Sequence, residues 1–174
     1  MATSTQVYLI RHGIAVDKGS QIKDEERSLT ESGRQKTQKV AKKLYQMGLR
    51  FDLILTSPLV RSRQTAEILH DSGLSSQLEE STSLAPDGDI HEMLNWLKQW
   101  QNDASGALEL ALVGHQPNLG EWAEILVWGE ARSGLVLKKS GIIGLTLPEA
   151  GLAIGRSQLF WLTPPKFLLS CGIE

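Results

Sequence analysis

The chain has 174 residues, a length typical of one domain with its own hydrophobic core. Hydrophobic residues make up 41% and charged residues 22%, a balance unlike that of a disordered or fibrous chain. The formal net charge of -2 excludes the broad basic surface that attracts nucleic acid or anionic membranes, so we expect neither partner and only a local anion site. This length therefore predicts a single domain over residues 1–174.

The first strand and helix are expected before residue 50. Residues 7–10 form a short apolar run that predicts a buried strand, and Arg11 and His12 follow it directly. Thr30 is a good helix N-cap, and the apolar residues after it lie on one helical face until Gly48. This pattern predicts a helix that crosses over to the next strand.

The second strand is expected over residues 51–56. Ser57 is predicted to cap the helix that follows, with Pro58 in its first turn and the helix continuing to about His70. Arg61 then lies in the first turn of that helix.

The rest of the chain predicts further strands and helices without a domain boundary. Asp89 precedes a helix with apolar residues at helical spacing, residues 108–113 form another apolar strand, and a helix is expected around residues 119–126. Residues 141–147 and 152–161 alternate as strands do and predict a hairpin.

Alternating strands and helices predict an α/β fold. We expect a three-layer αβα sandwich whose central sheet is mixed and mostly parallel. Ligands of such sheets bind outside the carboxyl ends of the strands, where Arg11, His12, Arg61 and His115 are all expected. Residues from separate segments should therefore converge at one edge of the sheet.

Two arginines and two histidines at such an edge are suited to phosphoryl transfer. Guanidinium groups bind phosphate oxygens in bidentate fashion, so Arg11 and Arg61 are the predicted phosphate ligands. A neutral imidazole can attack phosphorus when its other nitrogen is held as a donor, which makes His12 the predicted nucleophile. His115 is predicted to donate to the transferred group and to stabilise its charge.

Four segments of the chain resemble, in order, the motifs of the histidine phosphatase, or phosphoglycerate mutase-like, superfamily. They are Arg11-His12-Gly13 after the first strand and the segments 29–35, 57–66 and 113–117. The resemblance implies that His12 is the residue that becomes phosphorylated. Within the superfamily the chain is most similar to the short, SixA-type phosphohistidine phosphatases, which lack the lid-like helical insertion of the larger members.

The resemblance implies a phosphohistidine protein as substrate, namely a histidine phosphotransfer domain of a phosphorelay. Larger members carry a carboxylic general acid that has no clear counterpart here. Asp89 is the candidate, and a role as helix N-cap is at least as well supported for it. Because imidazole has a pKa of about 6.5, a phosphorylated histidine leaves without a strong acid.

Two other functions stay open. One is a small-molecule phosphomonoesterase with the same mechanism, and the other is a non-catalytic module that binds phosphoproteins. We expect no cofactor and no metal, since the sequence has neither a nucleotide-binding glycine motif nor a pair of histidines or cysteines at metal-ligand spacing.

The cellular compartment is predicted from cysteine usage and from the N-terminal region. Cys171 is the one cysteine in the sequence, so no intrachain disulfide can form, which is typical of a reducing compartment. The apolar run 7–10 is shorter than the apolar region of a signal peptide, and no run is long enough for a spanning helix. We therefore expect a cytoplasmic protein.

Overall fold

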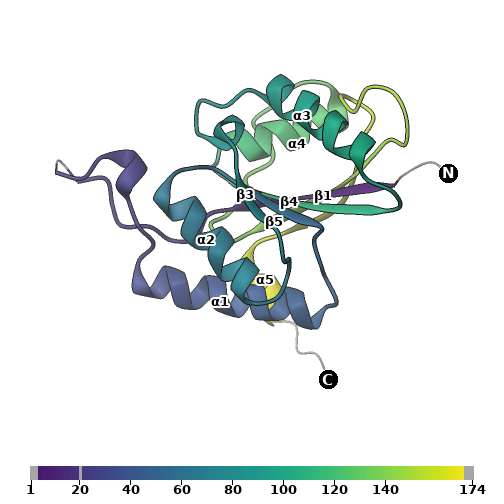
Figure 1. The fold of residues 1–174 in the computed structure, drawn as a ribbon. Coiled ribbons are helices and arrows are strands. Elements are labelled where there is room, and N and C mark those ends of the chain that lie inside the picture. Colours follow the sequence, from purple (N-terminus) through teal and green to yellow (C-terminus); the bar gives the residue numbers. More distant parts are fainter. Residues whose placement is uncertain (1–3, 20, 171–174) are drawn as a thin grey trace.

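The computed structural model describes residues 4–19 and 21–170, and its secondary structure alternates strands and helices (Figure 1). The strands are β1 (Thr5–Arg11), β2 (Leu53–Thr56), β3 (Leu78–Glu80), β4 (Leu108–Gly114), β5 (Ile142–Leu147) and β6 (Gln158–Thr163). The α-helices are α1 (Glu31–Gln46), α2 (Val60–Asp71), α3 (Ile90–Asp103), α4 (Asn118–Trp128) and α5 (Pro165–Ser170). Two short 3-10 helices, η1 (Asp24–Glu26) and η2 (Thr82–Leu84), lie in the connections. Cys171 falls outside the described residues.

The six strands form one mixed sheet in the order β3-β2-β4-β1-β5-β6. Strands β1, β2, β3 and β4 run parallel to one another, whereas β5 runs antiparallel to β1 and to β6. At the centre of the sheet, Leu9 of β1 pairs with Leu112 of β4 on one side and with Ile143 of β5 on the other. The predicted mixed, mostly parallel sheet is confirmed. Among the helices of the described residues, none is long and apolar enough to cross a bilayer.

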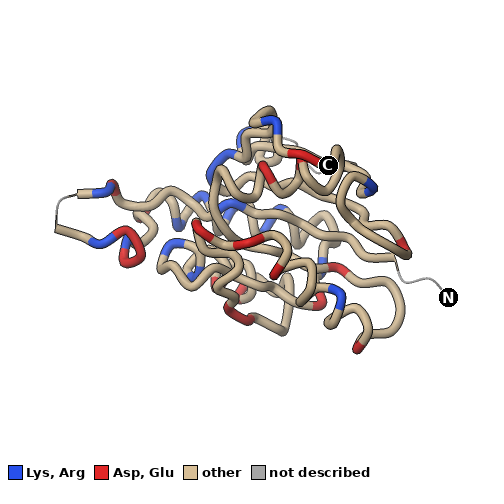
Figure 2. Tube along the Cα trace, turned by 90° about the horizontal axis from the view of Figure 1, so that it is seen from above, with Lys and Arg blue, Asp and Glu red and all other residues tan. Residues whose placement is uncertain are grey.

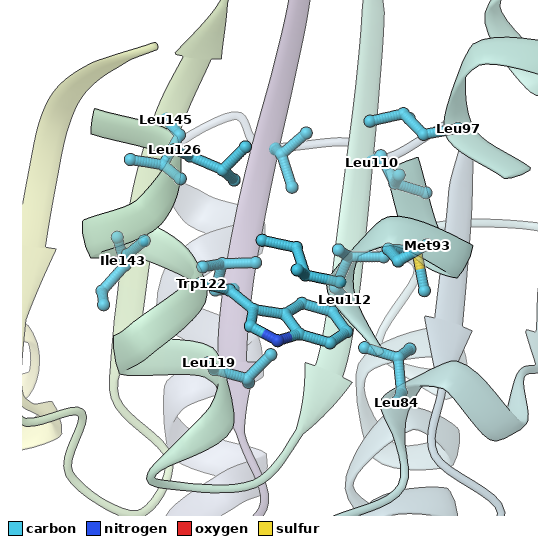
Figure 3. Close-up of a cluster of buried hydrophobic side chains, with 14 of the residues drawn as sticks. Leu84, Met93, Leu97, Leu110, Leu112, Leu119, Trp122, Leu126, Ile143 and Leu145 are labelled. Atoms are coloured by element: carbon cyan, nitrogen blue, oxygen red, sulfur yellow. The ribbon is translucent and has the colours of Figure 1, made fainter. Parts of the chain in front are cut away.

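Helices cover both faces of the sheet, which confirms the predicted three layers. In Figure 1, α3 and α4 lie on one face, and α1, α2 and α5 lie on the other. Alternate residues of the central strand point to opposite faces, so Leu9 joins the core under α3 and α4 while Ile10 joins the core under α1. Figure 3 shows the Trp122 ring of α4 packed among Leu112 and Leu119 in the first of these cores. Full burial of each such leucine contributes roughly 1.5–3 kcal/mol.

Helix α2 begins later than predicted. Leu59 is its N-cap and makes no side-chain capping bond, so the predicted cap at Ser57 is wrong. The Ser57 hydroxyl does accept a hydrogen bond from the Leu59 N–H at 3.3 Å, but its shorter contact is with His115 Nε2 at 2.8 Å. The Ser57 side chain thus makes a tertiary contact at the sheet edge, whereas the local sequence predicted that it would cap the helix.

The C-terminal hairpin forms, but its second strand covers residues 158–163 rather than 152–161. The connection after β5 instead packs against the end of α4, where Gly155 and Ser157 donate backbone hydrogen bonds to Ile125 and Leu126, each at 3.0 Å. Because these amides are already paired with α4, the residues that carry them do not extend the sheet.

Candidate active site

The carboxyl ends of β1, β2 and β4 bring three segments of the chain together. His12 follows β1, and its backbone N–H donates to the Gly114 carbonyl at 3.0 Å. Ser57 follows β2, and its N–H donates to the Val113 carbonyl at 2.9 Å. His115 follows β4, and the ring centroids of His12 and His115 lie 5.2 Å apart. The two histidines therefore share one site, as the strand-end rule led us to expect.

His12 is held in one orientation through both ring nitrogens. The side chain is 5% exposed, and its Nδ1 lies 2.7 Å from the Gly13 carbonyl oxygen, so this nitrogen carries the proton. Nε2 keeps its lone pair and accepts a hydrogen bond from Arg61 Nε at 3.3 Å. Burial, helped by His115 and the nearby arginines and opposed by the hydrogen bond to Gly13, lowers the pKa of His12 to about 3. At neutral pH the ring is therefore neutral and has a nucleophilic nitrogen.

Gly13 holds the backbone next to His12 in place. Its N–H donates to Thr65 Oγ1 of α2 at 3.0 Å. A β-carbon at this position would lie 2.5 Å from Thr37 Oγ1 of α1 and 3.3 Å from the Ser140 hydroxyl. Only glycine lets α1, α2 and the segment before β5 approach the end of β1 so closely. This gives the glycine of the Arg11-His12-Gly13 motif a steric reason.

Arg61 reaches the site from the first turn of α2. It is 4% exposed, and all three of its guanidinium nitrogens are engaged. Nε contacts His12, Nη1 donates to the Asp24 carbonyl at 2.6 Å, and Nη2 pairs with Asp24 Oδ2 at 3.0 Å. The guanidinium is thus fixed beside the nucleophilic nitrogen, where it can stabilise negative charge.

Asp24 is the site residue that the sequence did not reveal. It begins η1 in the segment between β1 and α1, which projects from the body of the molecule and carries residues of both charges (Figure 2). Its second carboxylate oxygen lies 2.8 Å from Arg27 Nη1. The hydrogen bonds from Arg27 and Arg61 hold the pKa of Asp24 below its usual value. The spacing of Asp24 and Arg27, three residues apart in a polar stretch, was the one signal available, and it resembles an ordinary solvated ion pair.

Arg11 is the last residue of β1, directly before His12, and is half-buried. Its Nη1 donates to the Leu137 carbonyl at 3.0 Å, which fixes the guanidinium against the segment before β5. Burial, together with the charge of Arg61, lowers the pKa of Arg11. The two arginines therefore repel each other across the site, and an anion between them would relieve that repulsion.

His115 is 3% exposed and contacts two serines. Its Nε2 lies 2.8 Å from Ser57 Oγ and 3.3 Å from Ser62 Oγ. Burial lowers the pKa of His115 to about 4, and the charge of Arg61 acts in the same direction. This ring is also neutral at neutral pH, so it can donate one hydrogen bond through whichever nitrogen carries the proton.

Two buried side-chain nitrogens have no hydrogen-bond partner among the described residues, and both belong to this site. They are Arg11 Nε and His115 Nδ1. Buried polar groups are paired in the great majority of cases, and an unpaired one calls for an explanation such as a catalytic role or a bound ion. With the guanidinium of Arg61, Arg11 Nε and the tautomer of His115 that carries its proton on Nδ1 make a set of donors suited to a tetrahedral oxyanion.

Asp89, the candidate acid, serves as the N-cap of α3. Its Oδ1 accepts a hydrogen bond from the His91 N–H at 2.8 Å, and the residue is exposed. Within residues 4–19 and 21–170, no hydrogen bond or ion pair joins it to His12, Arg61 or His115. The contacts of Asp89 match the capping interpretation, and a role in proton transfer stays a prediction. The described part of the chain also holds no group of three His, Cys, Asp or Glu placed to bind a metal ion.

Comparison with known proteins identifies the family. Residues 7–86 match the profile of the histidine phosphatase superfamily (branch 1). The chain is 30% identical to the phosphohistidine phosphatase SixA of Escherichia coli over 84% of its own length and 88% of that protein. It is also 47% identical to an uncharacterized protein of Picosynechococcus over 94% of its length and 99% of that protein.

Solved structures agree with the sequence comparison. A structure of the protein histidine phosphatase SixA complexed with tungstate superposes with a TM-score of 0.80 at 27% identity, covering 94% of this chain and 99% of that one. A phosphoglycerate mutase of Bacillus anthracis shares the fold at 13% identity, which confirms the predicted fold family. The chain therefore belongs to the histidine phosphatase superfamily, among its SixA-type members, and is a phosphatase.

Proposed function

We propose that this phosphatase removes phosphate from phosphohistidine on a protein, through a covalent phosphohistidine intermediate at His12 and without a metal. The observation that carries the proposal is the state of His12. Its Nδ1 proton is committed to the Gly13 carbonyl, and its neutral Nε2 lies next to the Arg61 guanidinium. This arrangement supplies a nucleophile and charge stabilisation at one point.

In the first step, Nε2 of His12 attacks phosphorus, and the bond between phosphorus and the imidazole nitrogen of the substrate breaks. The departing nitrogen takes the electron pair of that bond, and the substrate imidazole leaves as a neutral ring because its other nitrogen already carries a proton from the solvent. Negative charge on the three equatorial oxygens is shared by Arg11, Arg61 and a hydrogen bond from His115. In the second step, water attacks phosphorus and gives one proton to the solvent, the electron pair of the broken bond returns to Nε2, and inorganic phosphate leaves while His12, still protonated on Nδ1, is neutral again.

The choice of phosphohistidine over a phosphate ester rests on the carboxylates around the site. An alkoxide leaving group needs a strong proton donor, whereas imidazole leaves with little assistance. Asp24 is ion-paired to Arg27 and Arg61 with a lowered pKa, and Asp89 caps α3. Asp24 is thus held as a carboxylate, and the Asp89 side chain is engaged in the helix cap away from His12, which disfavours the small-molecule phosphomonoesterase.

The relatives support the same substrate class. The E. coli relative is named a phosphohistidine phosphatase, and tungstate, the ligand in the solved SixA structure, is a tetrahedral oxyanion like phosphate. We propose by analogy that a histidine phosphotransfer domain of a cytoplasmic phosphorelay is the substrate. A non-catalytic binding module would need the arginines but not a neutral, oriented His12.

The test compares phosphate release from a phosphorylated histidine phosphotransfer domain with release from p-nitrophenyl phosphate. We expect the phosphoprotein to be turned over with the higher kcat/KM, and His12→Ala to abolish that turnover while the protein stays folded. Quenching at alkaline pH followed by peptide mass spectrometry should place the trapped phosphate on His12. Full activity in His12→Ala would refute the mechanism, faster ester turnover would favour the phosphomonoesterase, and no turnover of either substrate would favour the binding module.

A further inference from the structure

A second pocket, rich in positive charge, adjoins the candidate active site. It has a volume of about 500 Å³, and its charged lining residues are all basic: Arg11, Lys36, Lys138, Lys139 and Lys166. Ile14 and two prolines complete its lining. We call this pocket the basic pocket. Its concentration of positive charge contrasts with the net charge of -2 on the whole chain.

The lysines converge from elements that are far apart in the sequence. Lys36 lies on α1, Lys138 and Lys139 precede β5, and Lys166 lies on α5. None of the four forms an ion pair with a carboxylate in the part of the chain that the structure describes. Like charges repel when they are brought together, so this arrangement favours an anionic occupant.

The basic pocket is fixed to the catalytic strand end through the backbone. The Ser140 N–H lies 3.1 Å from the Arg11 carbonyl oxygen and 3.3 Å from the His12 carbonyl oxygen. Arg11 in turn donates to Leu137, the residue just before Lys138. These bonds hold the two lysines at a constant position relative to His12.

We propose that the basic pocket binds acidic side chains of the protein substrate that lie next to its phosphohistidine. The inference rests on the proposed function and adds a preference for phosphohistidine in acidic surroundings. The shared residue Arg11 makes the pocket continuous with the phosphate site, so one substrate can occupy both. This continuity favours a segment of the phosphoprotein over a separate small anion or a lipid surface.

Pairs between exposed lysines and carboxylates are individually weak and are screened by salt. Removal of one lysine should therefore raise KM for an acidic substrate by about two- to fivefold, and kcat should change little. The KM for an acidic substrate should also rise with ionic strength more steeply than the KM for a neutral one.

The test uses two phosphohistidine peptides that differ only in whether Asp and Glu, or Asn and Gln, flank the phosphorylated residue. In the wild-type protein we expect a KM about tenfold lower for the acidic peptide. The double variant Lys138→Glu, Lys139→Glu should abolish or reverse that ratio. Lys98→Glu, an exposed position on α3 across the sheet, is the matched control and should keep the wild-type ratio. Circular dichroism checks that each variant is folded.

The outcomes separate the pocket from the proposed function. Turnover of both peptides with equal KM values, or a wild-type ratio in the double variant, would overturn the pocket assignment and leave the proposed function intact. Absence of turnover with either peptide would refute the proposed function and the pocket assignment with it. Equal KM values together with lysine-dependent binding to vesicles containing phosphatidylserine would assign the pocket to a lipid surface instead.

Discussion

The two buried histidines predict that acidification destabilises the protein in a pH range above the titration of its carboxylates. Burial lowers the native pKa of His12 to about 3 and that of His115 to about 4. In the unfolded chain both return to about 6.5. Between these values the unfolded state binds more protons than the native state, so the free energy of unfolding falls as the pH falls through about 6.5.

The size of the effect follows from proton linkage. Between pH 7 and pH 5, an unfolded pKa of about 6.5 and a native pKa well below 5 reduce the free energy of unfolding by roughly 2 kcal/mol for each histidine. His12 and His115 together therefore contribute a loss of up to about 4 kcal/mol. The loss continues below pH 5 until the native rings themselves become protonated.

Urea unfolding at pH 7, 6 and 5, followed by tryptophan fluorescence, measures this loss; the chain has 5 tryptophans. We expect His12→Gln and His115→Gln each to remove about half of the pH dependence, and the double variant to remove most of it. His91→Gln, at an exposed position on α3, controls for the changed histidine count. A double variant that keeps the full wild-type dependence would refute the reasoning. In that case His12 would not be held neutral by burial, and its role as a nucleophile at neutral pH would lose its basis.

Three further predictions concern the surroundings of the site. Asp24→Asn keeps a hydrogen-bond acceptor for the guanidinium but removes a negative charge, so the inhibition constant of inorganic phosphate should fall about three- to tenfold; an unchanged constant would contradict this. Gly13→Ala places a β-carbon 2.5 Å from Thr37 Oγ1, so thermal unfolding should show a loss of about 1–3 kcal/mol, and a fully stable variant would refute the steric argument. Ser57→Ala removes the contact at 2.8 Å to His115, and steady-state kinetics should show a kcat reduced about tenfold with a smaller change in KM. An effect on KM alone would show that the serine serves binding rather than catalysis.

The positions of the main site residues were predictable because they follow from regular structure. Short apolar runs mark parallel strands, and the carboxyl ends of such strands meet at one edge of the sheet. Arg11, His12 and His115 each stand at or just beyond the end of an apolar run, so their convergence required only the correct fold class. Arg61 was predictable because its helix begins shortly after the second strand.

Other features depend on contacts that no local pattern encodes. Asp24 contacts Arg61 because the long segment between β1 and α1 folds back toward α2. The sequence of that segment resembles a solvated charged loop, so it did not indicate the contact. Strand β3 has the sequence Leu-Glu-Glu, which has no apolar alternation, and it forms because Ile54 and its neighbours in β2 offer a free edge. The role of Ser57 was misassigned because capping is a local rule, whereas its shorter contact is with a residue 58 positions away.

The nucleophile and the lysine pair of the basic pocket come from different parts of the chain. His12 and Arg61 lie within the matched family profile, which ends at residue 86, whereas the segment that carries Lys138 and Lys139 lies beyond it. That segment is anchored by the buried carboxylate of Glu124, which accepts backbone hydrogen bonds from the four residues 132–135. The anchored backbone places the Leu137 carbonyl that receives Arg11 Nη1. Because the anchor acts through backbone atoms, the side chains at Lys138 and Lys139 can change with the substrate while Arg11 and the nucleophile keep their geometry.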